Sequence, residues 1–196
     1  MKNFWKRYSR KKRWWTIVLD FLFMAFVIVM LFPGTRKPVS VFLIRQTLFS
    51  PSETDKVVFL SENDWQLSLT RTGEQKELNL ENFKGKPLFV NFWATWCPPC
   101  VAEMPSIQRL YDEYKDKVAF ILISNENAAV INRFIEKNEY SMPVYSLLSN
   151  VPAVFETSTI PSTYLVSPSG RLLISKTGAA KWDSPKIKKI LNQLLQ

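Results

Sequence analysis

The two cysteines of the chain are separated by two prolines, in the segment "VNFWATWCPPC" that ends at Cys100. A Cys-x-x-C pair can be half of a zinc site, a haem attachment sequence or a redox pair. Zinc needs four ligands, and a chain without histidine or a second cysteine pair could supply them only as a dimer. Haem attachment needs a histidine after the second cysteine, where this chain has Val101. Thiol-disulfide exchange remains, with no metal and no cofactor other than the redox-active pair itself.

A buried strand and a helix must position this pair. The segment "KPLFVNFWAT" is a continuous apolar run, which indicates a strand buried on both faces. The residues after Cys97 carry apolar side chains at helical spacing, and prolines are tolerated in the first turn of a helix. Pro105, inside that pattern, predicts a kink. Cys97 is therefore expected at a helix N-terminus, where free amides and the helix dipole favour a thiolate.

This placement gives each cysteine a role. We expect Cys97 to be the attacking nucleophile, and Cys100, one turn along the same side, to attack the mixed disulfide and release the partner. Pro98 and Pro99 restrict the loop that keeps the two sulfurs at bonding distance. The alternative is a static disulfide or two buried core thiols, although a domain of this size does not need such a staple.

The rest of the domain around the motif alternates strands and helices. Before the motif, "WQLSLT" and "KELNL" on either side of "RTGEQ" predict a β-hairpin. After it, the pattern predicts a strand in "VAFILIS", a helix capped by Asn125 and a short strand in "MPVYSLL". Two strands joined by "SPSG" and a final helix capped by Ser184 follow. This order predicts an α/β fold with helices around a central mixed sheet.

The N-terminal region has a different composition. The chain has 196 residues and a formal net charge of +9, but its first 13 residues hold seven basic and no acidic residues. A nucleic-acid-binding protein would be expected to spread its cations over a folded face, so we expect no nucleic-acid partner.

An apolar run from Trp14 to Phe32 follows the basic residues. In a helix it would be about 28 Å long, which matches a hydrocarbon core of about 30 Å, and Asp20 near one end is tolerated. The positive-inside bias predicts a cytoplasmic tail (1–13), a transmembrane helix (14–32), a linker or stalk (33–55) and an exported domain (56–196). A cleaved signal peptide is the alternative, although no small-x-small cleavage site follows the run.

The segment "FVNFWATWCPPCVAEMP" resembles the active-site segment of the thioredoxin superfamily, specifically its membrane-anchored TlpA/ResA branch. The aromatic residues before Cys97, the proline at 105 and the dipeptide Ile160-Pro161 lie where that family has them. The resemblance implies a thioredoxin fold with an added N-terminal β-hairpin. It also implies that Pro161 is a cis proline beside the cysteines and that the backbone of Ile160 pairs with the partner's strand. The residues expected to bind the client are Trp96, Pro98, Ile160 and Pro161, whereas Trp93 is expected in the core.

One position departs from ordinary thioredoxin. Where thioredoxin has a buried aspartate in the strand before the motif, this chain has Asn91, which cannot take a proton from the resolving thiol. Glu103, one helical turn after Cys100, matches an acidic residue of the ResA-like branch and is the candidate proton acceptor. Burial beside the thiols should raise its pKa into the range useful for proton transfer. A solvated helix glutamate is the alternative.

The motif also bears on the direction of electron flow. Strong oxidants often carry a histidine between the cysteines, where this chain has Pro98 and Pro99, so the motif favours a reductant. The resemblance implies electrons from a transmembrane thiol donor and disulfide-containing clients outside the cytoplasm, apocytochromes c among them. We therefore expect a single-pass, membrane-anchored monomer whose catalytic domain lies on the periplasmic or extracytoplasmic side of the cytoplasmic membrane. A disulfide oxidase or isomerase, or a tethered module that only binds peptides, is the alternative.

Overall fold

The computed structural model describes residues 14–31 and 33–196. The chain divides into two compact units, Met1–Phe42 and Leu43–Gln196. Helix α2 (Trp14–Leu31) covers the predicted apolar run, and α3 (Pro33–Gln46) contains the boundary between the units. The predicted basic tail and Phe32 lie outside the described residues.

Within the described ranges, no helix has both the length and the apolar character needed to cross a membrane. The predicted transmembrane helix over residues 14–32 therefore stays a prediction.

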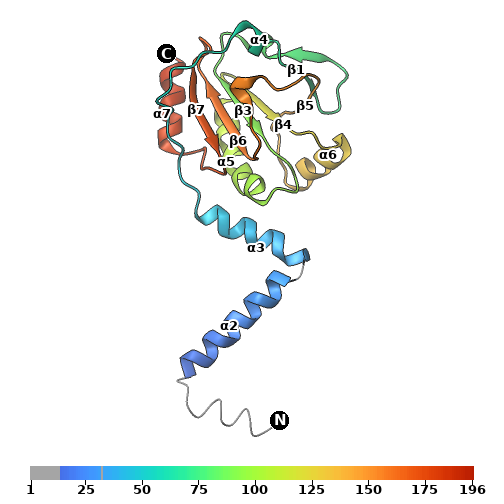
Figure 1. The fold of residues 1–196 in the computed structure, drawn as a ribbon, viewed down its shortest axis with the longest axis vertical. Helices are drawn as coiled ribbons and strands as arrows, with labels where there is room; N and C mark the ends of the chain where they lie inside the picture. Colours follow the sequence, from blue (N-terminus) through green and yellow to red (C-terminus); the bar gives the residue numbers. More distant parts are fainter. Residues whose placement is uncertain (1–13, 32) are drawn as a thin grey trace. The chain divides into compact units, whose positions relative to one another are not determined.

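The second unit is built on a seven-stranded sheet with the order β2-β1-β5-β4-β3-β6-β7 (Figure 1). The β3–β4 and β4–β5 pairs are parallel, and the other pairs are antiparallel. This confirms the predicted mixed sheet and the predicted hairpin, which is β1–β2. The strands are β1 (Ser68–Arg71), β2 (Glu77–Asn79), β3 (Leu88–Phe92), β4 (Ala119–Ile123), β5 (Val144–Leu147), β6 (Ser162–Val166) and β7 (Leu172–Thr177).

Two hydrophobic cores cover the two faces of the sheet. Every residue of β3 and β4 is buried, which explains why both read as continuous apolar runs. Because successive strand residues point to opposite faces, Phe89 joins one core and Val90 the other. Side chains of α5 (Pro98–Tyr114), α6 (Ala128–Lys137) and α7 (Pro185–Leu194) pack in the first core. The second contains residues of α4 (Glu62–Trp65) and of two short 3₁₀ turns, Leu80–Phe83 and Ala153–Phe155.

The helix starts follow the predictions with one correction. Cys97 caps α5 with Pro98 as its first residue, and Ser184 caps α7, where its hydroxyl accepts the amide of Ile187. The predicted cap of α6 is wrong: Asn127, and not Asn125, accepts the amide of Ala129 at 2.9 Å. The helix starts later because the residues that follow β4 form a loop that contacts the redox motif.

The chain before β1 runs along the edge strand β7. The amide of Thr54 donates to the carbonyl of Leu173 at 2.8 Å, and the amide of Leu60 donates to that of Gly170 at 2.9 Å. These backbone bonds cover part of an otherwise open sheet edge. Residues that precede position 56 are thus part of the compact unit.

Candidate redox site

Cys97 and Cys100 form a disulfide at the N-terminus of α5, with 5.3 Å between their Cα atoms. Both are buried, and the amide of Cys100 donates to Cys97 Sγ at 3.2 Å. This amide is one of the first helical N–H groups, which have no carbonyl partner inside the helix. After reduction, the same amide and the positive end of the helix dipole stabilise a thiolate at Cys97.

The peptide bond between Ile160 and Pro161 is cis, as the resemblance implied. It lies beside the motif, because the carbonyl oxygen of Ile160 is 3.7 Å from Cys97 Sγ. In the disulfide Cys97 has no S–H to donate, so this is a contact that can become a hydrogen bond only after reduction. The structure thus brings Cys97 beside Ile160 and Pro161, which lie more than 60 positions later in the sequence.

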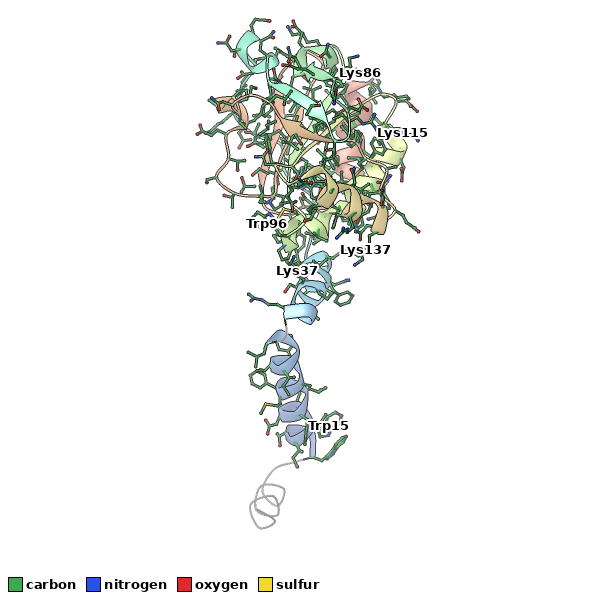
Figure 2. All side chains as sticks on the ribbon, turned by 90° about the vertical axis from the view of Figure 1, so that its right-hand side faces the viewer. Trp15, Lys37, Lys86, Trp96, Lys115 and Lys137 are labelled. Carbon is green, nitrogen blue, oxygen red and sulfur yellow. A yellow bond between two sulfur atoms is a disulfide. The ribbon has the colours of Figure 1, made fainter. Side chains whose placement is uncertain are left out.

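The two tryptophans before Cys97 have different environments. Trp93 is buried, with its ring centroid 5.4 Å from that of Phe134, as expected for a core residue. Trp96 is 59% exposed, and Figure 2 shows it at the surface of the domain. Beside it is a hollow of about 230 Å³. The lining residues are Phe92, Trp93, Ala94, Trp96, Ile123, Ser124, Asn125, Glu126 and Ile160.

Glu126 fixes the loop that precedes Cys97. Its carboxylate accepts the amide and the hydroxyl of Thr95, each at 2.6 Å. This contact was not predicted from the sequence. A signal existed, because Glu126 follows β4 and Thr95 follows β3, and the carboxyl ends of neighbouring parallel strands meet at one edge of a sheet.

Glu103 is fully buried on the inner side of α5. Its Oε1 accepts Asn91 Nδ2 at 2.9 Å, and its Oε2 accepts the amide of Ala180 at 3.0 Å and Trp182 Nε1 at 3.1 Å. Burial raises the pKa of Glu103 to about 7, although the donors Trp182, Ala180 and Asn91, and the charge of Lys176, act in the opposite direction. The burial of the Glu103 carboxyl group and its raised pKa are as expected, while its role in proton transfer stays a prediction.

The buried polar cluster around Glu103 continues into the sheet. Asn91 Nδ2 also donates to Thr163 Oγ1 at 2.7 Å, and Asn91 Oδ1 has no hydrogen-bond partner among the described residues. None of Thr163, Ala180 and Trp182 was predicted from the sequence as part of the site. No spacing signal could have found the last two, since they lie 77 and 79 positions from Glu103.

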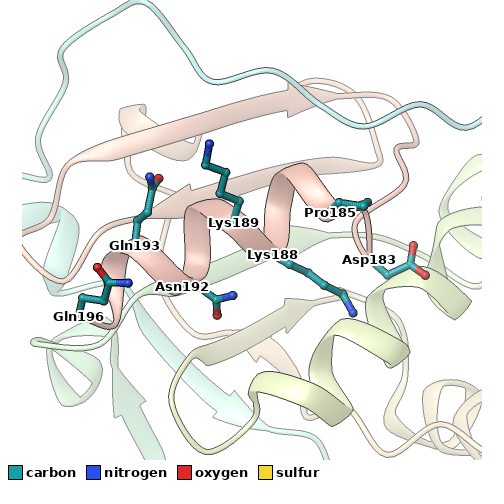
Figure 3. Close-up of a pocket in the computed structure, with 7 residues that line it drawn as sticks. All are labelled: Asp183, Pro185, Lys188, Lys189, Asn192, Gln193 and Gln196. Atoms are coloured by element: carbon teal, nitrogen blue, oxygen red, sulfur yellow. The ribbon is translucent and has the colours of Figure 1, made fainter.

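A larger, shallow hollow of about 650 Å³ runs along α7 (Figure 3). It includes none of the residues assigned to the redox chemistry or to client binding. We therefore do not assign it to the redox site. The lining residues are Asp183, Pro185, Lys188, Lys189, Asn192, Gln193 and Gln196.

Residues 53–191 match the Redoxin family model. The chain is 35% identical over 124 residues to the thiol-disulfide oxidoreductase ResA of Oceanobacillus iheyensis, an alignment that covers 61% of this chain and 65% of that protein. It is 34% identical over 125 residues to ResA of Halalkalibacterium halodurans, with 57% of this chain and 71% of that one covered. A thioredoxin-like protein from Porphyromonas gingivalis superposes with a TM-score of 0.52 and 25% identity, over 66% of this chain and 90% of that structure.

Proposed function

Because the chain belongs to the redoxin family, we propose that it is a thiol-disulfide oxidoreductase whose redox pair is Cys97 and Cys100. The observation that carries the proposal is the disulfide at the N-terminus of α5, with the cis Ile160–Pro161 bond beside it. A purely structural disulfide would need neither a position at a helix N-terminus nor an adjacent backbone segment on which a client can dock.

The first step is attack on the client. The thiolate of reduced Cys97 attacks one sulfur of the client disulfide, the bond between the two client sulfurs breaks, and the second client sulfur leaves as a thiolate. The product is a mixed disulfide between Cys97 and the client. The exposed ring of Trp96 and the backbone of Ile160 flank Cys97, and we assign them to holding the client segment, together with Pro98 and Pro161.

The second step releases the client. Cys100 loses its proton and attacks Cys97 Sγ, the mixed disulfide breaks, and the client sulfur leaves as a thiolate that takes up a proton. Two electrons have then passed from the pair to the client, and Cys97 and Cys100 are joined as in this structure. We assign the acceptance of the Cys100 proton to Glu103, because its pKa of about 7 lets it exchange protons near neutral pH.

We further propose that the protein works as a reductant of disulfides outside the cytoplasm, as in cytochrome c maturation. The proline pair between the cysteines supports this direction. A reductant needs its dithiol restored after each turnover, and we propose a transmembrane thiol protein as the electron donor. The domain would act as a monomer and use no cofactor besides its redox pair.

Membrane anchoring through residues 14–32 is part of this proposal. Its support is the apolar run of α2 after the basic tail, and a tether raises the local concentration of a domain near membrane-bound partners. Extraction of cell membranes with alkaline carbonate tests it. An anchored chain stays in the pellet at full length, whereas a cleaved or peripheral chain appears in the supernatant.

The test of the proposed function has two parts. The reduced full-length chain should release thiols from a peptide disulfide, and Cys97→Ser should not. Equilibration in thiol-disulfide buffers should give a reduction potential near or below about −220 mV, whereas a value near about −120 mV would indicate an oxidant. A Cys97→Ser chain that still acts on its client would indicate a peptide-binding module instead.

A further inference from the structure

The loop between β7 and α7 supplies two of the hydrogen bonds to Glu103. The amide of Ala180 and the indole N–H of Trp182 both donate to Glu103 Oε2. The amide of Trp182 donates to Ser106 Oγ at 3.2 Å, one turn further along α5. This loop, residues 180–184, is therefore attached on its inner side to the helix that carries the redox pair.

The outer side of the same loop is attached to the segment that follows α3. The amide of Lys181, between the two residues that face Glu103, donates to the carbonyl of Phe49 at 2.9 Å. The hydroxyls of Ser50 and Ser184 are 2.7 Å apart and share a hydrogen bond. The loop is thus held between α5 on one side and residues 49 and 50 on the other.

The preceding residues lie over the same part of α5. A hollow of about 330 Å³ has Arg45, Gln46 and Leu48 on one wall. Its other walls are formed by Lys181 and by α5 residues that immediately surround Glu103 in the sequence, such as Ala102 and Pro105. Residues 45–50, which we call the strap, therefore cover the loop and the first turns of α5 together.

We propose that the strap is a positioning element of the redox site, which holds residues 180–184 against α5 and so keeps the two loop donors on Glu103. The inference rests on the proposed role of Glu103 for its functional meaning. On this proposal, the strap, which joins the N-terminal helices to the domain, helps to set the pKa of the Glu103 carboxyl group.

The direction of the effect follows from the groups that face Glu103. These are Asn91 from β3, the two loop donors Ala180 and Trp182, and the charge of Lys176 on β7. The uncharged Cys97–Cys100 disulfide lies at the start of the same helix. A hydrogen bond donated to a carboxylate stabilises its charged form. Loosening the strap weakens the bonds from Ala180 and Trp182 while Asn91 stays in the sheet, so the pKa of Glu103 should rise.

The experiment compares two double variants of the full-length chain. In F49G/S50G, glycine loosens the strap backbone and removes the Ser50 hydroxyl, at little packing cost because Phe49 is 81% exposed. The control S52G/E53G places the same two glycines just after the strap, at exposed positions whose side chains form no hydrogen bond or ion pair with the loop among the described residues. The readout is the NMR signal of the Trp182 indole N–H against pH in the oxidised protein, which reports Glu103 ionisation without turnover. Trp182→Phe assigns the signal.

We expect the midpoint to rise by about half a pH unit in F49G/S50G, which is about a threefold decrease in the ionisation constant of Glu103. The midpoint should stay unchanged in S52G/E53G. An unchanged midpoint in F49G/S50G, or equal shifts in both variants, would overturn the proposal. If F49G/S50G does not fold, Ser50→Ala against Ser52→Ala decides, with a smaller rise expected for Ser50→Ala alone. A chain that shows the expected shift but exchanges no disulfides would refute the proposed function and leave the strap inference standing.

Discussion

The two sides of the first turns of α5 are built in different ways. On the outer side, Cys97 is placed by its own neighbours in the sequence: it caps the helix and accepts the amide of Cys100 three residues later. On the inner side, Glu103 is placed by partners 12, 77 and 79 positions away. The nucleophile therefore depends on local chain geometry, whereas the candidate proton acceptor depends on the whole domain.

The largest effect on activity is expected at Cys97, the residue placed by its sequence neighbours. Replacing the nucleophile in Cys97→Ser should lower disulfide exchange by more than about a thousandfold, because no other thiol can begin the first step. Cys100→Ser should complete the first step and stop, which leaves a mixed disulfide with the client. Mass spectrometry of the non-reduced protein measures both results. Formation of the same adduct on Cys100 in Cys97→Ser would show that the roles are exchanged.

The next largest effect concerns the buried Glu103 and should appear in the pH dependence of the free energy of unfolding. The pKa of Glu103 is raised from 4.5 to about 7 on folding, so the native state binds a proton that the unfolded state has lost. The free energy of unfolding should therefore fall as pH rises through this window, by about 3 kcal/mol between pH 4.5 and 8. Urea denaturation at both pH values should show this loss in the wild type and not in Glu103→Gln. Equal losses in both proteins would contradict the assignment.

A smaller change removes one distant partner. Trp182→Phe deletes the indole N–H that donates to Glu103, and the pKa of Glu103 should rise by about one unit. The matched control is Phe89→Leu, because Phe89 packs edge-on against Trp182 at 5.0 Å but donates no hydrogen bond to the carboxyl group. The ¹³C chemical shift of the Glu103 carboxyl group, followed against pH, measures this pKa in both variants. If Phe89→Leu moved the titration as far, packing rather than the donor would set the pKa.

The smallest effect is expected at the exposed surface of the motif. Trp96→Ala should raise the KM for a peptide disulfide by a few fold and leave the melting temperature unchanged, because this ring is mostly exposed and contacts the client rather than the core. The control is Leu148→Ala, which removes a similarly exposed apolar side chain beside β5. Equal changes in KM for the two variants would remove Trp96 from the docking surface.

The same contrast explains what the sequence could predict. Apolar runs and alternation predicted the strands, and the spacing of the cysteines and prolines predicted the start of α5, because these signals depend on near neighbours. The burial of Glu103 was an expectation from the resemblance, and its partners Ala180 and Trp182 were not predicted. Their approach depends on how the loop after β7 folds back onto α5, which no local pattern encodes.

The cap of α6 shows the limit of local signals in a single case. Asn125 and Asn127 are both good capping residues two positions apart, and propensity does not separate them. Tertiary structure decides, because Glu126 must reach Thr95 across the strand ends, and the helix begins only after that contact is made. The contact between Glu126 and Thr95 holds the loop before Cys97, and α6 therefore starts two residues later than predicted.

The most direct test of Glu103 as the proton acceptor is the rate of client release from the Cys97 mixed disulfide, measured in single turnover between pH 5 and 9 for the wild type and Glu103→Gln. If Glu103 accepts the Cys100 proton, the wild-type rate should rise with pH through an inflection near 7, the pKa of Glu103, as the carboxylate becomes able to take up that proton. Glu103→Gln should be slower at neutral pH and lack that inflection. Superimposable profiles for the two proteins would contradict the assignment of Glu103 as the proton acceptor.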